Sequence, residues 1–267
     1  MEMIREFFGI GGYLRNPEGY MSWQHLTFVT SLLVIMALAA VLLGRRNRHR
    51  TEKEKNLVLI VSAIAIDSFE LIKIAARCID DGFDAIINLL PLFLCSVQLI
   101  AIPLAAFSKG RLREASLDFV SIFGLLGALL GTYGAGQNYN AYPVLSADNV
   151  ISGLTHAISG FAALYILISG MSSMKRHNIP VTYAIIMAFC VPAYLVNKIA
   201  DCNYMFLMRG DGTPYDILYN LVGGSPVLYP LGVILLFFVY IAAFYQVYFH
   251  VQAVLRRKKA AAMSGQA

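Results

Sequence analysis

The sequence predicts an all-α membrane protein, built as a bundle of seven membrane-spanning helices. Hydrophobic residues make up 58% of the 267 residues and charged residues only 14%, against about 25% charged residues in typical soluble chains. The mean hydropathy is +0.64. Apolar stretches recur along the whole chain at close to the ~20 residues that a helix needs to cross a bilayer. This composition excludes a disordered chain, a collagen and a small disulfide-stabilised secreted domain.

Seven apolar stretches have the length of a membrane-spanning helix. The second stretch is the least apolar, because it carries Asp67, Glu70 and Lys73. The fourth is rich in glycine, which is typical of helices that pack closely in lipid. The expected helices cover residues 25–44, 56–76, 86–107, 117–135, 150–171, 181–200 and 227–250.

The positions of the basic residues predict the orientation of the bundle. Most of the 21 Lys and Arg residues fall in alternate connections and in the C-terminal tail. Cytoplasmic loops carry the excess of Lys and Arg, so we expect the N-terminus outside and the C-terminus in the cytoplasm. The net charge of +5 is explained by this topology, and we expect no nucleic-acid partner. The basic segments are 45–55, 109–113, 175–176 and 256–259.

No linker long enough to separate two domains interrupts the chain. We therefore expect a single integral membrane domain over residues 1–267, in a multi-pass protein of the cell membrane. Residues 1–22 are rich in aromatic side chains and suit the membrane interface. Residues 251–267 form a basic cytoplasmic tail.

Polar side chains within the expected helices gather toward the outside, whereas the inner halves are almost entirely Leu, Ile, Val and Ala. A polar group inside hydrocarbon is costly and needs a partner. We therefore expect an outward-facing polar cavity that binds a substrate. Its candidate substrate-binding residues are Asp67, Glu70, Lys73, Asn88, Gln98, Tyr194, Asn197 and Asp201.

Helical spacing refines this expectation. Glu70 and Lys73 are three residues apart and can form an ion pair, which serves either structure or function. His156 shares a face with the small residues of its helix and should point into the bundle. Cys95 lies on the same stripe as Gln98. A lone buried thiol is inert unless a basic group activates it.

Short segments of the chain resemble a known family. The segments are MSWQHLTF, NLLPLFLCS, THAISGFAALYILISG and VNKIADCNYMFLM. Together they are similar to the bacterial YwaF-like integral membrane proteins, which in turn resemble the eukaryotic transmembrane protein 164 group. Members of that group are described as acyltransferases that move fatty acyl chains between phospholipids.

The resemblance implies a catalytic cysteine and a catalytic histidine. His156 stands where the family histidine stands. The family cysteine directly follows the proline, whereas here Leu92 follows Pro91 and the cysteine is Cys95. The NKIADCNYM segment fits the family pattern, so the resemblance adds Asn203 to the substrate-binding residues.

Three functions remain open from the sequence. The first is a phospholipid acyltransferase or related lipid-acyl hydrolase, with His156 as general base and Cys95 as a nucleophile. Its substrate would be a membrane lipid, either a phospholipid or an acyl chain. The alternatives are a non-catalytic receptor or accessory protein and a small-solute transporter. We expect no cofactor and no metal, because no nucleotide-binding loop, zinc motif or haem motif is present. Protein partners cannot be predicted.

Overall fold

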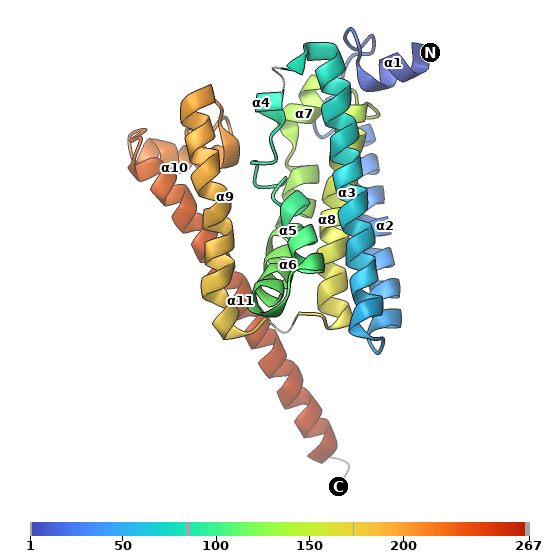
Figure 1. Ribbon diagram of the computed structural model, residues 1–267, viewed down its shortest axis with the longest axis vertical. Helices are drawn as coiled ribbons and strands as arrows, with labels where there is room; N and C mark the ends of the chain where they lie inside the picture. Colours follow the sequence, from blue (N-terminus) through green and yellow to red (C-terminus); the bar gives the residue numbers. More distant parts are fainter. Residues whose placement is uncertain (1, 84–85, 173, 265–267) are drawn as a thin grey trace.

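A computed structural model describes residues 2–83, 86–172 and 174–264, and all regular structure in these residues is helical (Figure 1). The long helices are α2 (Trp23–Asn47), α3 (Glu52–Asp81), α6 (Gly110–Tyr133), α8 (Ala147–Ser169), α9 (Ile179–Ala200) and α11 (Leu228–Ser264). The short ones are α1 (Glu2–Phe8), α4 (Ile86–Leu89), α5 (Gln98–Phe107), α7 (Gly136–Ala141) and α10 (Tyr215–Leu221), with 3-10 turns η2 (Arg176–Asn178) and η3 (Tyr204–Phe206).

Local sequence signals fix where the central helices begin and end. At the start of α3, the Thr51 hydroxyl accepts a hydrogen bond from the Glu54 N–H at 3.3 Å, and the Glu54 carboxylate accepts one from the Thr51 N–H at 2.9 Å. This reciprocal pair is a capping box. Helix α8 begins after Ser146, which caps the Asn149 N–H, and ends at Gly170 in the left-handed region. Glycine adopts that conformation without steric cost.

Five helices in the described residues are long and apolar enough to cross a membrane on their own, so the chain is a multi-pass membrane protein. They cover Trp23–Asn47, Gly110–Ala141, Ala147–Ser169, Arg176–Ala200 and Leu228–Lys258. The expected count of seven uninterrupted spanning helices is not supported. Helix α3 is long enough, with 30 residues, but its apolar stretch contains three charged residues.

The expected third helix, residues 86–107, is wrong as a single helix. Helix α4 stops at Leu89, residues 90–97 are turns, and α5 begins at Gln98. The physical reason is Pro91, which has no N–H to donate and disfavours helical backbone at the residue before it. The apolar composition alone predicted one continuous helix, and the proline divides it.

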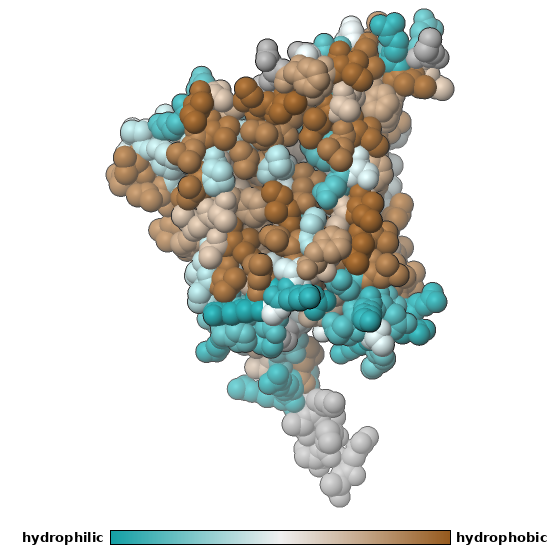
Figure 2. Space-filling model, viewed as in Figure 1, coloured by the Kyte–Doolittle hydropathy of each residue, from teal (hydrophilic) through white to brown (hydrophobic). Residues whose placement is uncertain are grey.

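The helices pack as two groups that meet at α6. Helix α8 packs along both α6 and α2, with α3 beside them, while α9 lies between α6 and α11 (Figure 1). The connections after α2, α5 and α8 and the end of α11 lie at one end, which we call the basic end, opposite α1, α4, α7 and α10. Figure 2 shows hydrophilic residues along this end, directly below a broad apolar band.

Glycines bring α6 and α8 into backbone contact. A β-carbon added at Gly124 would lie 2.6 Å from the Ser159 carbonyl oxygen, and one at Gly160 would lie 2.6 Å from the Ala128 β-carbon. Such distances are too short for real side chains. The close packing expected from the glycine-rich fourth stretch is therefore confirmed, and it fixes the spacing between the helices beside the cavity described below.

The expectation that the inner helix halves are nearly all apolar is wrong at Asp118 of α6. Its side chain is 1% exposed and accepts hydrogen bonds from Asn178 Nδ2 at 2.9 Å, from the Tyr245 hydroxyl at 2.8 Å and from the Ser172 hydroxyl. Buried polar groups persist when their hydrogen bonds are satisfied. Asp118 therefore joins α6, the α8–α9 connection and α11 near the basic end.

Candidate functional site

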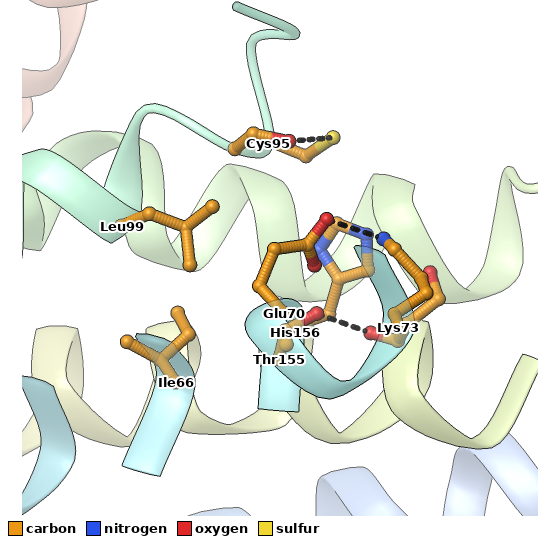
Figure 3. Close-up of a pocket in the computed structure, with 9 residues that line it drawn as sticks. Ile66, Glu70, Lys73, Cys95, Leu99, Thr155 and His156 are labelled. Carbon is orange, nitrogen blue, oxygen red and sulfur yellow. Dashed lines mark hydrogen bonds and ion pairs between the residues drawn. The ribbon is translucent and has the colours of Figure 1, made fainter. Parts of the chain in front are cut away.

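A small cavity of about 40 Å³ lies between α3, α5, α8 and the turns of residues 90–97 (Figure 3). This volume accommodates a few water molecules and is too small for an acyl chain. Irregular backbone at membrane depth is tolerated where it lines such a polar space. The cavity is lined by Ile66, Glu70 and Lys73 of α3, Cys95 and Ser96 of the turns, Leu99 of α5, and Ser152, Thr155 and His156 of α8.

An ion pair forms one wall of the cavity. Lys73 Nζ lies 2.6 Å from Glu70 Oε1, one helical turn apart on α3. The Glu70 residue is 8% exposed, and the Lys73 side chain is 22% exposed. A buried charge is tolerated in an apolar bundle when an opposite charge compensates it. The expected pairing of these residues is therefore confirmed, and both face the cavity.

His156 of α8 is 7% exposed and belongs to the same cavity. Its imidazole rests against α6 at Gly131, where an added β-carbon would overlap the ring. Among the described residues, no hydrogen-bond partner is recorded for either ring nitrogen. In Figure 3 the His156 ring lies next to the Glu70 and Lys73 side chains. The imidazole is thus held in place by packing.

Cys95 lines the cavity from the irregular segment, and in Figure 3 it lies apart from the group formed by Glu70, Lys73 and His156. Its Sγ lies 3.9 Å from the Ser96 hydroxyl oxygen. Within the described part of the chain no hydrogen bond joins Cys95 to His156. The cavity nevertheless brings a thiol, two hydroxyl-bearing side chains of α8 and an imidazole to one water-sized space. That set can carry out nucleophilic and general-base chemistry.

Two other predicted residues, Asp67 of the expected second helix and Gln98 of the expected third, do not line the cavity. Asp67 is half-buried on α3, and no hydrogen bond or ion pair is recorded for it among the described residues. Gln98 is 1% exposed, and both of its amide atoms lack partners in the described structure. The side chain of Asn88 lies outside what the structure describes.

Asn197, at the end of α9, organises the backbone rather than the cavity. Its Nδ2 donates to the Tyr204 carbonyl at 3.0 Å, and its Oδ1 accepts from the Tyr204 N–H at 2.7 Å. The Tyr204 hydroxyl in turn donates to the Ile87 carbonyl and accepts from the Leu90 N–H at 3.2 Å. Burial raises the pKa of Tyr204 to about 12, so this hydroxyl keeps its proton. Asn197 thus positions the turns before Cys95 from a distance.

The remaining predicted residues lie near the end of α9 and in the segment that follows it. Asn203 is half-buried, and its amide binds the backbone of Arg209 and the carboxylate of Asp211. Asp201 is fully exposed in a left-handed conformation at the end of α9. Tyr194 is half-buried, with Lys198 Nζ 5.7 Å from its ring centre. None of them lines the cavity.

Two polar clusters near the end opposite the basic end were missed by sequence reasoning. Arg77 of α3 forms a two-pronged ion pair with Asp148 of α8, and the Tyr13 hydroxyl donates to the same carboxylate at 2.6 Å. Burial and the neighbouring Asp148 raise the pKa of Tyr13. His25 is fully buried, accepts the Met21 N–H at Nδ1 and binds the Thr132 carbonyl through Nε2. The acidic residue in the first turn of α8 was the available signal for the ion pair.

A family model matches residues 20–248, which include the cavity and every long helix in whole or in part. The chain belongs to the TMEM164 family. The match confirms the transmembrane protein 164 part of the resemblance; the bacterial YwaF-like assignment and the acyltransferase activity are not covered by it. No curated protein and no solved structure matches the chain. In the described residues, no group of three His, Cys, Asp or Glu side chains could hold a metal ion.

Proposed function

We propose that this TMEM164-family protein transfers acyl groups of phospholipids, or hydrolyses them, at the cavity between α3, α8 and the turns of residues 90–97. The observation that supports the proposal is the presence of Cys95 and His156 on one water-sized cavity, although they are 61 positions apart in the chain. The family resemblance implies the same pair of residue types. A lipid substrate suits a site that opens within an apolar bundle.

In the proposed reaction, Cys95 is the nucleophile and His156 is the general base. His156 takes the thiol proton while sulfur attacks the ester carbonyl, and the tetrahedral intermediate collapses to a thioester as the lysophospholipid leaves with the proton from His156. A second lipid hydroxyl, or water, then gives its proton to His156 and attacks the thioester carbonyl. The C–S bond breaks as the new ester or free acid forms, and the Cys95 sulfur takes the proton back from His156. The same imidazole serves both half-reactions.

The Glu70–Lys73 ion pair supplies charge beside the reacting groups. An ammonium group near a developing oxyanion is more effective in a site of low dielectric than in water. Glu70 holds Lys73 at the cavity wall through the 2.6 Å contact. Because the cavity itself is small, the acyl chain would lie outside it, along the apolar surface of the bundle.

We further propose that the chain crosses the cell membrane seven times, with the cavity toward the outside. Helix α3 provides the second crossing, its charges compensated by the ion pair, and α4, the turns and α5 together provide the third. Interrupted crossings of this kind occur where the irregular backbone lines a cavity. The collection of basic connections at one end (Figures 1 and 2) supports a cytoplasmic location for that end.

The test is acyl transfer by the purified protein in lipid nanodiscs. A phospholipid with an isotopically labelled acyl chain is supplied with a lysophospholipid acceptor, and products are measured by mass spectrometry. Cys95→Ala and His156→Gln should each reduce transfer by at least about 100-fold, the usual contribution of a nucleophile or general base. Cys78→Ala, which removes a thiol of α3 that does not line the cavity, is the matched control.

A hydroxylamine-sensitive acyl group on wild type, absent from Cys95→Ala, would identify the thioester. If Cys95→Ala retains full transfer, the nucleophile is another group of the cavity, such as Ser96. If wild-type protein neither transfers nor hydrolyses acyl groups, the enzymatic proposal is wrong, and the cavity belongs to a binding protein or a transporter.

A further inference from the structure

A second, larger concavity lies at the basic end, far along α11 from its start. It is a groove of about 550 Å³ between the α8–α9 connection and residues 248–256 of α11. Sites for small ligands typically have volumes of this order. The groove is lined on one side by Lys175 and Arg176 and on the other by Tyr248, Phe249, Gln252 and Arg256.

The length of α11 places this groove at the depth of lipid headgroups. The helix has 37 residues, which at 1.5 Å per residue span about 55 Å, whereas the hydrocarbon core is about 30 Å thick. Its last third therefore extends beyond the hydrocarbon. Tyr248 and Phe249 mark the boundary, where aromatic residues are enriched. Figure 2 shows the hydrophilic layer of this end directly below the apolar band.

Asp118 holds the two walls of the groove together. The Ser172 hydroxyl and Asn178 Nδ2, on either side of the connection, donate to its carboxylate, and the Tyr245 hydroxyl donates from α11. The Ser172 hydroxyl also accepts the N–H of Met174, another lining residue. The groove is thus built by buried hydrogen bonds and does not depend on a ligand for its shape.

Two of the three cationic groups of the groove have no acidic partner among the residues that the structure describes. Lys175 is compensated by Glu114 at 2.8 Å. For Arg176 and Arg256, no ion pair is recorded among the described residues. The Arg176 guanidinium instead lies 5.1 Å from the centre of the Phe249 ring, a stacking contact that orients it. A guanidinium held in this way presents its N–H donors to an anion, and phosphate oxygens match their geometry.

We propose that this groove binds the phosphate headgroup of an anionic phospholipid from the leaflet at the basic end. Arg176 and Arg256 contact the phosphate from opposite walls, and the acyl chains follow the apolar surface of α11 into the bilayer. Val247 and Val251, 64% and 47% exposed, provide such a surface beside the groove. Basic pockets between membrane helices recognise anionic lipids by this combination. The site is separate from the cavity of the proposed acyl transfer.

Native mass spectrometry of the full chain with phosphatidylglycerol tests the assignment. The variant R176Q/R256Q removes both groove cations. The variant R46Q/R257Q removes two exposed cations that do not line the groove and is the matched control. Because each basic side chain near a lipid surface adds substantially to anionic-lipid affinity, we expect R176Q/R256Q to bind phosphatidylglycerol at least about tenfold more weakly. The control should stay within about twofold of wild type.

Two further ligands are measured: phosphatidylcholine as a lipid without net charge, and inorganic phosphate as a competitor without acyl chains. Wild type should prefer phosphatidylglycerol to phosphatidylcholine, and millimolar inorganic phosphate should leave lipid binding unchanged. Equal weakening in both double variants would show a general charge effect and overturn the proposal. Equal binding of the two lipids, or displacement of phosphatidylglycerol by inorganic phosphate, would also overturn it. Thermal unfolding of each variant confirms that the groove remains folded.

Discussion

The position of the His156 ring depends on a glycine of α6, Gly131. The imidazole lies against the backbone of α6 at Gly131, and a β-carbon there would overlap the ring. Glycine is thus required at position 131, because the His156 ring approaches the backbone too closely to leave room for a side chain. Gly127, one turn earlier on α6, faces the same ring across an ordinary gap, since an added β-carbon would lie 3.9 Å from Nδ1.

These two glycines give a matched pair of substitutions. Gly131→Ala should displace the His156 ring and lower acyl transfer by at least about tenfold, because small misplacements of a catalytic group have large kinetic effects. Gly127→Ala should leave transfer within about twofold of wild type. The measurement is the nanodisc assay with a thermal unfolding scan. Equal activity of the two variants would contradict the placement of His156.

At the scale of helices and connections, two features decide the architecture: how helices are capped and how they are tied together. The start of α3 rests on the Thr51–Glu54 capping box. Hydrogen bonds from the Thr51 N–H and then from its hydroxyl hold the pKa of Glu54 below its usual value. Glu54 is exposed and precedes the expected membrane span. Its carboxylate therefore exchanges protons directly with the aqueous solution.

The capping box predicts a pH-dependent effect of Glu54→Gln. Because the folded-state pKa of Glu54 lies below its unfolded value of about 4.3, ionised Glu54 stabilises the fold above that pH. This stabilisation is lost as the pH falls through the lower folded-state pKa. The unfolding midpoints of wild type and Glu54→Gln should therefore differ at pH 7 and converge toward pH 3. A difference that is independent of pH would contradict the role of the charge.

The hydrogen bonds of Asp118 connect elements that come from three parts of the chain. Asp118→Ala leaves the buried donors of Ser172, Asn178 and Tyr245 without their acceptor. Unsatisfied buried groups cost about 1–3 kcal/mol each, so we expect a loss of about 3 kcal/mol or more in stability. Chemical unfolding in detergent measures this loss.

Glu114→Ala is the control for Asp118→Ala, one turn earlier on α6. Glu114 pairs with Lys175 and His177 at a partly exposed position. Exposed ion pairs contribute about 1 kcal/mol or less, so this variant should be close to wild type in stability. Equal losses in the two variants would show that Asp118 has no special structural role.

At the scale of the whole molecule, the collection of basic connections at one end of the bundle predicts its orientation in the membrane. In a background with all four cysteines replaced by alanine, a single cysteine is introduced at an exposed position of each end. Leu221, 80% exposed at the end of α10, samples the end opposite the basic end. Lys53, in the first turn of α3, samples the basic end.

Leu221→Cys should react with a membrane-impermeant maleimide in intact cells. Lys53→Cys should react only after permeabilisation, because positive charge is retained on the cytoplasmic side. Gel-shift detection of the labelled chain measures both. The reverse pattern would invert the proposed topology and place the cavity toward the cytoplasm.

Hydropathy and charge in the sequence by themselves determined the class of this protein. Long apolar stretches need an apolar solvent whatever their neighbours, so an all-α membrane protein followed directly, as did the buried ion pair of Glu70 and Lys73, which are one turn apart. Short-range signals of this kind survive folding because they are set within a single helix. The count of continuous helices failed at Pro91, where one residue outweighed the apolar composition around it.

Only the tertiary structure decided which polar side chains meet. Glu70, Lys73, Cys95 and His156 reach one cavity because α3 and α8 pack side by side and the turns after Pro91 fold against them. Asn197, equally plausible in sequence, uses its amide to hold the backbone of Tyr204. Asp118 was not among the residues singled out from the sequence, because its three partners come from segments more than 50 residues away. Contacts between distant segments depend on helix order and rotation, which one-dimensional periodicity does not encode.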